Sequence, residues 1–205
     1  MRVVSFLHQK GGTGKSTLAI ALATSLAAQG ARVLLLDADY QGTSAEWGNR
    51  FGAALHVEVR SQVQPIVEHE AGRFAARVEW FVIDGPPGLS PMTESILRAG
   101  GRVIVPLRPA APDLWALPWF AAVLAKARRA GSAAAPLIVC NQHRGEDLAA
   151  LAQQAAEWQL PLHSEPIPDD PAFPRLYLGE PLPEPLRARL LRLAEGVPEL
   201  APRPG

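Results

Sequence analysis

The sequence predicts an α/β fold: a doubly wound, mostly parallel sheet with helices on both faces. Short, continuous apolar runs alternate with helix-length segments, which is the pattern of strands buried on both faces and joined by helical crossovers. Prolines cluster at 106–118 and 161–188, as expected of constrained loops at the carboxyl ends of strands. Because the chain has 205 residues and a hydrophobic share of 48%, we expect a single domain over 1–197 and a flexible tail over 198–205.

The first elements are a strand, a loop and a helix. The run Val3–Leu7 is apolar and strand-like, and the segment that starts at Thr17 is helix-forming until Gly30 closes it. Apolar runs recur along the rest of the chain, so further strands are expected at 32–36, 57–59, 80–83, 102–105, 137–140 and 162–167. Helices are expected at 15–29, 44–52, 63–75, 90–99, 113–130, 146–158 and 184–195.

The loop after the first strand has the composition of a phosphate site. It reads His8-Gln-Lys-Gly-Gly-Thr-Gly-Lys-Ser-Thr17 and carries two of the chain's three lysines. Apart from these three lysines, the chain uses arginine for its positive charges. A lysine ammonium is a compact charge that suits phosphate oxygens, and glycines let backbone N–H groups approach the anion. The alternative, a glycine-rich turn without a ligand, needs neither the two lysines nor the hydroxyl pair that ends the segment. A strand before the loop and a helix after it are the context that supports a phosphate loop.

The spacing of this loop departs from the standard phosphate-loop pattern, which requires glycine where Gln9 stands. The segment Lys10-Gly-Gly-Thr-Gly-Lys-Ser16 instead resembles the deviant Walker A motif of the ParA/MinD superfamily of P-loop ATPases. The resemblance implies that Lys15 and the loop backbone hold the phosphates of ATP, and that Lys10 reaches across a dimer interface to the partner's phosphates. Both lysines would then be catalytic, and Ser16 would bind Mg²⁺. The implied nucleotide-binding residues are Gly11, Gly12, Thr13, Gly14, Lys15, Ser16 and Thr17.

Two later strands end in carboxylates. The first is followed by Asp37-Ala-Asp39-Tyr40-Gln-Gly, which resembles the superfamily's DxDPQG segment with Tyr40 where proline is usual. Alternation directs Asp37 and Asp39 to the same side if the strand stays extended. The resemblance makes Asp39 the catalytic residue that positions the attacking water, and Asp37 a contributor on the Mg²⁺ side. The alternative is that one of them only caps a helix near residue 43.

The second such strand reads Trp80-Phe-Val-Ile-Asp84-Gly-Pro-Pro-Gly88. It resembles a Walker B strand followed by a switch loop. Asp84 would hold Mg²⁺ through water, because hard oxygen ligands suit that ion. Glycines at 85 and 88 would let the loop move when the γ-phosphate leaves.

Two segments near the carboxyl end occupy the places where this superfamily contacts the base. They make Asn141 and Pro168 the expected adenine contacts, although both could lie in ordinary strand-to-helix turns. The sequence shows no guanine-binding signature, which favours ATP. The segment 107–116 resembles the family's proline-rich interface, with Asp113 as a cross-dimer contact and Trp115 as a packing anchor. The alternative there is a helix N-cap at Asp113 beside a core tryptophan.

Composition excludes several other classes of site. The single cysteine, Cys140, excludes a disulfide or Cys-pair metal site within one chain, and its apolar setting predicts a small buried residue. The formal net charge is zero, so DNA binding needs a local patch or an assembled oligomer. No apolar run approaches the roughly 18 residues of a membrane span, and the first strand begins too early for a signal peptide. We therefore expect a cytoplasmic, nucleoid-associated protein.

Within the superfamily, the chain resembles most the small ParA class of ParF-like partition ATPases. That resemblance implies a homodimer with ATP sandwiched between subunits, slow Mg²⁺-dependent hydrolysis, binding to nonspecific DNA, and a ParB/ParG-like adaptor that links the ATPase to a plasmid, chromosome or protein cargo. Candidate DNA contacts are Arg175, Arg187, Arg189 and Arg192, with Lys126, Arg128 and Arg129 as a second patch.

Two alternatives remain open. One is a MinD-like or accessory regulatory ATPase that acts through membrane or protein contacts. Against it, the segment 184–194 places Leu186, Leu190 and Leu193 on one face of a short helix, which we expect to dock on the domain rather than insert in a membrane. The other is ligase or synthetase chemistry on a similar fold.

Overall fold

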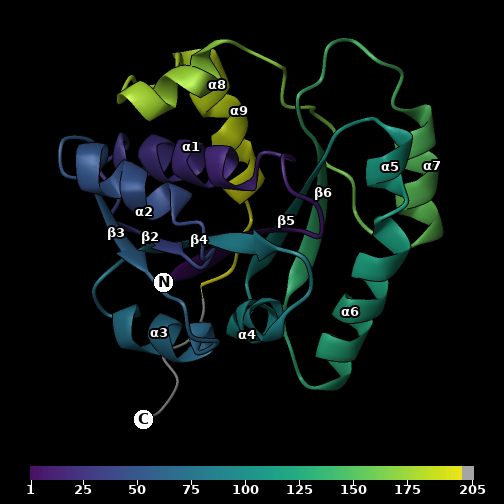
Figure 1. Cartoon of the computed structure of the whole chain (residues 1–205), viewed down its shortest axis with the longest axis horizontal. Coiled ribbons are helices and arrows are strands. Elements are labelled where there is room, and N and C mark those ends of the chain that lie inside the picture. The colour runs from purple at the N-terminus through teal and green to yellow at the C-terminus, as the bar shows by residue number, and fades with distance from the viewer. Residues whose placement is uncertain (200–205) are drawn as a thin grey trace.

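The computed structural model describes residues 1–199 and places a six-stranded parallel sheet between two layers of helices (Figure 1). The strand order is β3-β2-β4-β1-β5-β6. The strands are β1 Arg2–His8, β2 Val33–Asp37, β3 Val57–Ser61, β4 Trp80–Pro87, β5 Arg102–Leu107 and β6 Ala135–Cys140. Because β1 lies between β4 and β5, the loop that follows it opens near the middle of the sheet's carboxyl edge.

The central strands are apolar on both sides, so helices cover both faces of the sheet. Along β1, Val4 and Phe6 point into one core, which α1 and α9 cover, while Val3 and Leu7 point into the other, which α3, α4 and α6 cover. The helices are α1 Lys15–Ala27, α2 Thr43–Trp47, α3 Val67–Phe74, α4 Pro91–Ala99, α5 Ala111–Leu114, α6 Leu117–Arg129, α7 Ala149–Glu157, α8 Ala172–Arg175 and α9 Glu184–Ala194. Two short turns complete them, the π-helical η1 Gly48–Gly52 and the 3-10 helix η2 Leu176–Leu178.

The register of three neighbouring strands brings together Asp37 and Asp84, two of the predicted site carboxylates. Asp37 at the end of β2 lies opposite Asp84 of β4, and Asp84 lies opposite Phe6 of β1. The glycine-rich loop between β1 and α1 starts only a few residues after Phe6. Strand pairing alone therefore brings the loop and both carboxylates to one place on the sheet edge.

The predicted strands are confirmed with one exception. The segment 162–167 forms no strand; it makes only isolated bridges, between Leu162 and Ile138 and between Pro168 and His143. Prolines at 161, 166 and 168 lack the N–H that a continuous ladder needs. The prediction of a strand there is wrong, although the segment still runs beside β6.

One helix prediction also needed correction, and two short helical elements were not predicted. The expected helix 113–130 is split into α5 and α6, with Pro118 in the first turn of α6; proline cannot donate the hydrogen bond that would continue the earlier turn. The short elements α8 and η2 were not predicted, because the segment 172–178 is too short to show a helical period. Both lie beside the start of α1 (Figure 1).

Helix α9 docks on the domain, as predicted. Leu186, Leu190 and Leu193 are buried in the core shared with α1. Cys140 is buried too, as expected of a small core residue. Among residues 1–199, no helix is long and apolar enough to cross a membrane.

The predicted flexible tail, 198–205, lies largely outside the described residues. Its second residue, Glu199, forms an ion pair of 2.9 Å with Arg2 and a backbone bridge to the same residue.

Candidate nucleotide site

The loop between β1 and α1 leaves its glycine backbone accessible. Gly12 and Gly14 have φ angles of +76° and +93°, a left-handed conformation that other residues rarely adopt. A Cβ at Gly11 or Gly12 would meet nothing within 4 Å, whereas a Cβ at Gly14 would lie 2.3 Å from Asn141 Nδ2. The loop is thus packed tightly at its end and open before it, where a ligand can approach the backbone.

Helix α1 begins without the groups that usually satisfy a helix N-terminus. Gly14 makes no side-chain cap, and the first turn holds no acidic residue, so the free N–H groups and the positive end of the helix dipole face the loop. The Lys15 ammonium lies 3.1 Å from the carbonyl oxygen of Lys10, and burial lowers its pKa while Asp84 and Asp39 oppose that shift. These positive groups fit an anion such as a phosphate.

Asp84 is a buried carboxylate that the chain satisfies only in part. It is fully buried, and its Oδ2 accepts a hydrogen bond of 2.7 Å from Ser44 Oγ, but its Oδ1 has no partner among residues 1–199. Burial raises the pKa of Asp84 to about 7, with the hydroxyls of Ser44 and Ser16 opposing that shift. A buried carboxylate that has one unpartnered oxygen and the Ser16 hydroxyl as a neighbour suits a hard cation such as Mg²⁺.

The other two predicted carboxylates take different positions. Asp37 is buried and accepts backbone hydrogen bonds from Asp39, at 3.0 Å, and from Ala45 in the first turn of α2, at 2.7 Å. Asp37 therefore accepts a hydrogen bond from the first turn of α2, as the helix-capping alternative predicted. Asp39 is half-buried and accepts a hydrogen bond from the Gln41 backbone. Its negative charge partly offsets the lowering of the Lys15 pKa that burial causes.

A cavity of about 220 Å³ adjoins the loop. It is lined by Gly14, Thr17 and Leu18 on the loop and α1, by Asn141 and Gln142 after β6, and by Pro168, Asp169, Asp170, Phe173, Pro174 and Tyr177. Both residues predicted to contact adenine therefore line the same cavity.

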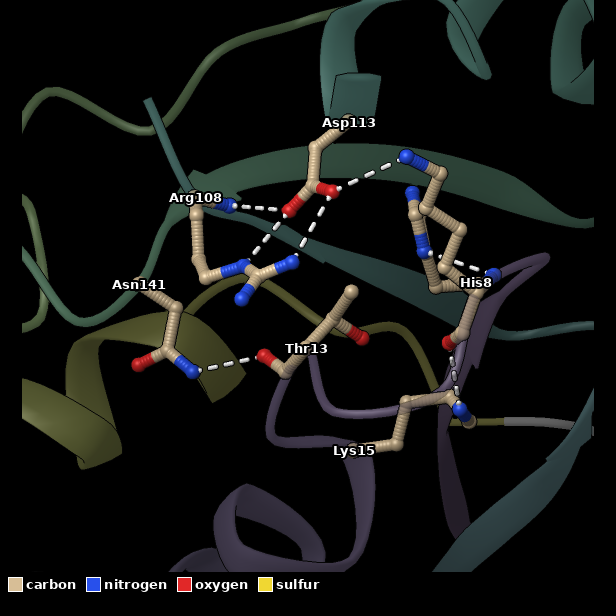
Figure 2. Close-up of polar contacts among 7 residues, drawn as sticks. His8, Thr13, Lys15, Arg108, Asp113 and Asn141 are labelled. Carbon is tan, nitrogen blue, oxygen red and sulfur yellow. Dashed lines mark hydrogen bonds and ion pairs between the residues drawn. The ribbon is translucent and has the colours of Figure 1, made fainter. Parts of the chain in front are cut away.

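The two segments that hold these residues are joined to each other and to the loop. His143 N donates to Ile167 O at 3.0 Å, and Asp169 N donates to His143 O at 2.9 Å. Asn141 Nδ2 donates to Thr13 O at 2.8 Å (Figure 2). The amide group of Asn141 thus fixes the loop as well as lining the cavity.

The glycine backbone of the loop, the start of α1 and the Lys15 ammonium together form a cradle that fits an anion. The Lys10 side chain does not point into this cradle. Its Nζ lies 3.4 Å from Oδ1 of Asp113, and Figure 2 shows Asp113 and Arg108 well apart from Lys15. Asp113 is fully buried and accepts three hydrogen bonds from Arg108, from its backbone N, Nε and Nη2 at 3.2, 2.9 and 3.2 Å. Burial alone would raise the pKa of Asp113, but Arg108 and Lys10 outweigh it and lower that pKa.

These contacts bear on the predictions for the segment 107–116. In this structure Asp113 has no exposed surface and is bonded to Arg108 and Lys10 of its own chain, and the cross-dimer contact through it stays a prediction. The alternative is wrong, because Asp113 lies inside α5 rather than before it and Trp115 is 73% exposed instead of in the core. An exposed Trp115 leaves its predicted role as a packing anchor open.

Several residues of the site were missed by sequence reasoning. Ser44, Arg108 and Tyr177 all contact predicted site residues. Arg108 precedes Asp113 by five positions and could have been found as a nearby counter-charge. The other two carry no local signal, because their contacts depend on how distant segments pack.

Comparison with known proteins agrees with this geometry. Residues 4–180 match the family model described as the CobQ/CobB/MinD/ParA nucleotide binding domain. The chain is 40% identical over 114 residues to maintenance of carboxysome distribution protein A of Gloeobacter kilaueensis, covering 55% of this chain and 52% of the relative. It is 31% identical over 150 residues to the chromosome partitioning protein ParA of Caulobacter vibrioides, covering 53% and 56%. The chain therefore spans about half the length of these curated relatives.

Solved structures share the fold at low sequence identity. A putative plasmid partition protein from Borrelia burgdorferi B31, bound to AMPPNP, superposes with a TM-score of 0.74 at 15% identity, over 95% of this chain and 97% of that one. The MinD cell division protein of Aquifex aeolicus gives 0.74 at 17% identity, over 98% and 100%. The family model over residues 4–180, the parallel sheet and the glycine-rich loop at its carboxyl edge all point to the same family. The chain belongs to the CobQ/CobB/MinD/ParA family of nucleotide-binding domains, with the fold of the ParA/MinD P-loop proteins.

Proposed function

We propose that this chain is a ParA-like ATPase that dimerises around ATP and positions a plasmid, chromosome or protein cargo along DNA through an adaptor protein. The observation that carries the proposal is the divergence of the two loop lysines. Lys15 lies in the cradle, whereas Lys10 is held at Asp113, away from the same chain's cradle. A second lysine that does not serve its own site is what a site shared between two subunits needs.

Nucleotide binding follows from the groups that the loop leaves unsatisfied. The backbone amides from Gly11 to Ser16, with the Lys15 ammonium, would hold the phosphates, and Thr13 Oγ1 is a buried hydroxyl without a partner among residues 1–199. Thr17, which follows the loop at the start of α1, would contact the phosphates, and the cavity residues Asn141 and Pro168 would hold the nucleoside.

Hydrolysis follows from the carboxylates around the loop. Ser16 and Asp84 would hold Mg²⁺, with Asp37 behind them. That ion, when bound, neutralises charge on the phosphates. Asp39, half-buried near Lys15, would orient the attacking water. A site that works mainly by positioning and charge stabilisation fits slow turnover.

Dimerisation is supported by two exposed tryptophans in the segment that follows Asp113, the residue that holds Lys10. Trp115 is 73% exposed and Trp119 is 48% exposed, and large aromatic side chains contribute strongly when an interface buries them. Release of Lys10 from Asp113 costs little free energy, because Arg108 still donates three hydrogen bonds to that carboxylate. A partner's triphosphate can then compete for the Lys10 ammonium without leaving a bare buried charge behind.

The DNA contacts need revision. Most of the predicted basic residues form ion pairs within the chain: Arg175 with Glu180, Arg187 with Glu184, Arg189 and Arg192 with Glu165, and Lys126 with Glu94. Arg128 and Arg129, exposed at the end of α6, have no ion pair with any residue in the range 1–199. Arg128 and Arg129 are therefore the better candidates for DNA contacts. A dimer would carry four of these arginines. Such a protein would be cytoplasmic and associated with the nucleoid.

The first prediction concerns Lys10. Lys10→Ala should bind ATP with an affinity within about threefold of the wild type, because a half-buried charge held at Asp113, away from the phosphates, contributes little to its own site. It should nevertheless stay monomeric with ATP, as measured by light scattering after size exclusion. Lys126→Ala, which removes the chain's third lysine, is the matched control and should dimerise normally. A Lys10→Ala protein that dimerises like this control would contradict the shared site.

The second prediction concerns Asp84 in the nucleotide-free, Mg²⁺-free protein. The unfolded chain ionises this carboxyl near the ordinary aspartate pKa of 3.8, while the folded protein, with its pKa of about 7, keeps it protonated to much higher pH. The folded state therefore holds the extra proton, so its stability falls as the pH rises through this window. Asparagine does not titrate, so Asp84→Asn should be more stable than the wild type by roughly 1–3 kcal/mol at pH 8.

That difference should shrink towards pH 4, and thermal unfolding at pH 4, 5.5 and 8 in EDTA measures it. Glu157→Gln, which alters an exposed carboxylate on α7, should show no such trend. Equal stability of Asp84→Asn and wild type at every pH would refute a strained, partly satisfied carboxylate. The same variant should lose Mg²⁺-dependent ATP hydrolysis.

The third prediction tests DNA as the track. With a non-hydrolysable ATP analogue the protein should bind nonspecific duplex DNA, and with ADP it should not. If the dimer contacts four phosphates, its affinity should fall roughly 100-fold between 50 and 200 mM salt. Arg128→Ala/Arg129→Ala should flatten this salt dependence without changing dimerisation. Equal binding with ATP analogue and ADP, or none with either, would rule out DNA as a nucleotide-controlled partner.

A further inference from the structure

We infer that Tyr177, from the short helix η2, is a nucleotide-positioning residue: its hydroxyl orients Thr17 toward the phosphates and its ring forms a wall of the nucleoside cavity. The inference rests on the proposed nucleotide site and adds to it a residue that lies outside every motif of the loop.

The first observation is a hydroxyl pair. Tyr177 Oη and Thr17 Oγ1 are 3.0 Å apart, although 160 positions separate them in the sequence. A tyrosine phenol is protonated at neutral pH and can donate, because its ordinary pKa is about 10; partial burial raises the pKa of Tyr177 further. If it donates to Thr17, the Thr17 hydroxyl keeps its own hydrogen for an anion in the loop. Hydrogen bonds in such a chain strengthen one another.

The second observation is the place of the ring. Tyr177 lines the cavity of about 220 Å³ next to the loop, together with Phe173 and Pro174. It also borders a second hollow, lined by the segment 41–43 and by α2 and η1. An aromatic ring at this boundary offers a flat apolar surface to a base or sugar.

The third observation is that η2 is rigidly anchored. Trp47 Nε1 donates to Leu176 O at 2.9 Å, and Leu176 is fully buried. Gly179 has a φ of +79°, and a Cβ there would lie 2.6 Å from the Phe51 ring, so the chain passes too close for any other residue. A residue that positions a ligand must itself be held by its surroundings. These contacts hold the backbone on either side of Tyr177, which is 36% exposed and can meet a ligand.

The test compares two ligands, ADP and inorganic tripolyphosphate, each with Mg²⁺, by titration calorimetry. Tyr177→Phe removes the hydroxyl and should weaken ADP binding about threefold to tenfold, the usual value of one hydrogen bond. Tyr177→Leu also removes the ring and should weaken ADP binding by about a further fivefold or more. The step from Phe to Leu should leave tripolyphosphate binding unchanged, because that ligand has no nucleoside.

Tyr40→Phe is the matched control, since it removes the chain's other phenol hydroxyl from an exposed position, and ADP should bind it as tightly as the wild type. In a double-mutant cycle with Thr17→Val, Tyr177→Phe should have little further effect, because the two hydroxyls act as a pair. The inference is overturned if both Tyr177 variants bind ADP like the wild type, or if Tyr177→Leu weakens ADP and tripolyphosphate equally relative to Tyr177→Phe. A wild-type protein that binds neither ligand would reject the nucleotide site itself.

Discussion

The site depends on charged and polar groups that the fold buries without giving them full partners. Asp84 Oδ1 and Thr13 Oγ1 have no hydrogen bond within residues 1–199, and the Lys15 side chain is buried, with only 6% of the residue exposed. Such groups cost stability in the empty protein. They are tolerated because β1 lies at the middle of the sheet, so the loop, the start of α1 and the end of β4 meet at one point. A bound nucleotide with its cation would complete each of these groups at once, which links binding to stability.

A second arrangement keeps the two loop lysines apart. Lys15 is fixed by the helix it begins, whereas the Lys10 ammonium has one partner within residues 1–199, a 3.4 Å contact to Asp113. Arg108 holds the same carboxylate through both its backbone and its guanidinium. Asp113 is therefore a docking point for Lys10 that stays neutralised when Lys10 leaves. In the proposed cycle, Lys10 rests on Asp113 in the monomer and contacts the partner's nucleotide in the dimer, so the loop itself needs little rearrangement.

Much of this could be predicted from the sequence, because it depends on local patterns. The apolar runs located the six strands of the sheet, and the two lysines among glycines located the loop that faces the start of α1. The failures have physical causes. Prolines removed the donors that the strand expected at 162–167 needed. Arg108 binds the Asp113 carboxylate inside the chain, where the sequence offered a helix N-cap as the alternative. Tyr177 and Ser44 could not be found, because their roles arise only from packing between distant segments.

The most direct test of the shared site is complementation between two inactive variants. Lys10→Ala keeps Lys15 and Asp39, while Asp39→Ala keeps both lysines, and each alone should hydrolyse little ATP. If Lys10 acts on the partner's nucleotide, mixing the two variants creates dimers in which the Lys10→Ala subunit receives a lysine from its neighbour. ATPase activity should then rise well above the sum of the separate proteins. If the mixture shows only that sum while mixed dimers form, Lys10 serves its own chain and the shared-site account is contradicted.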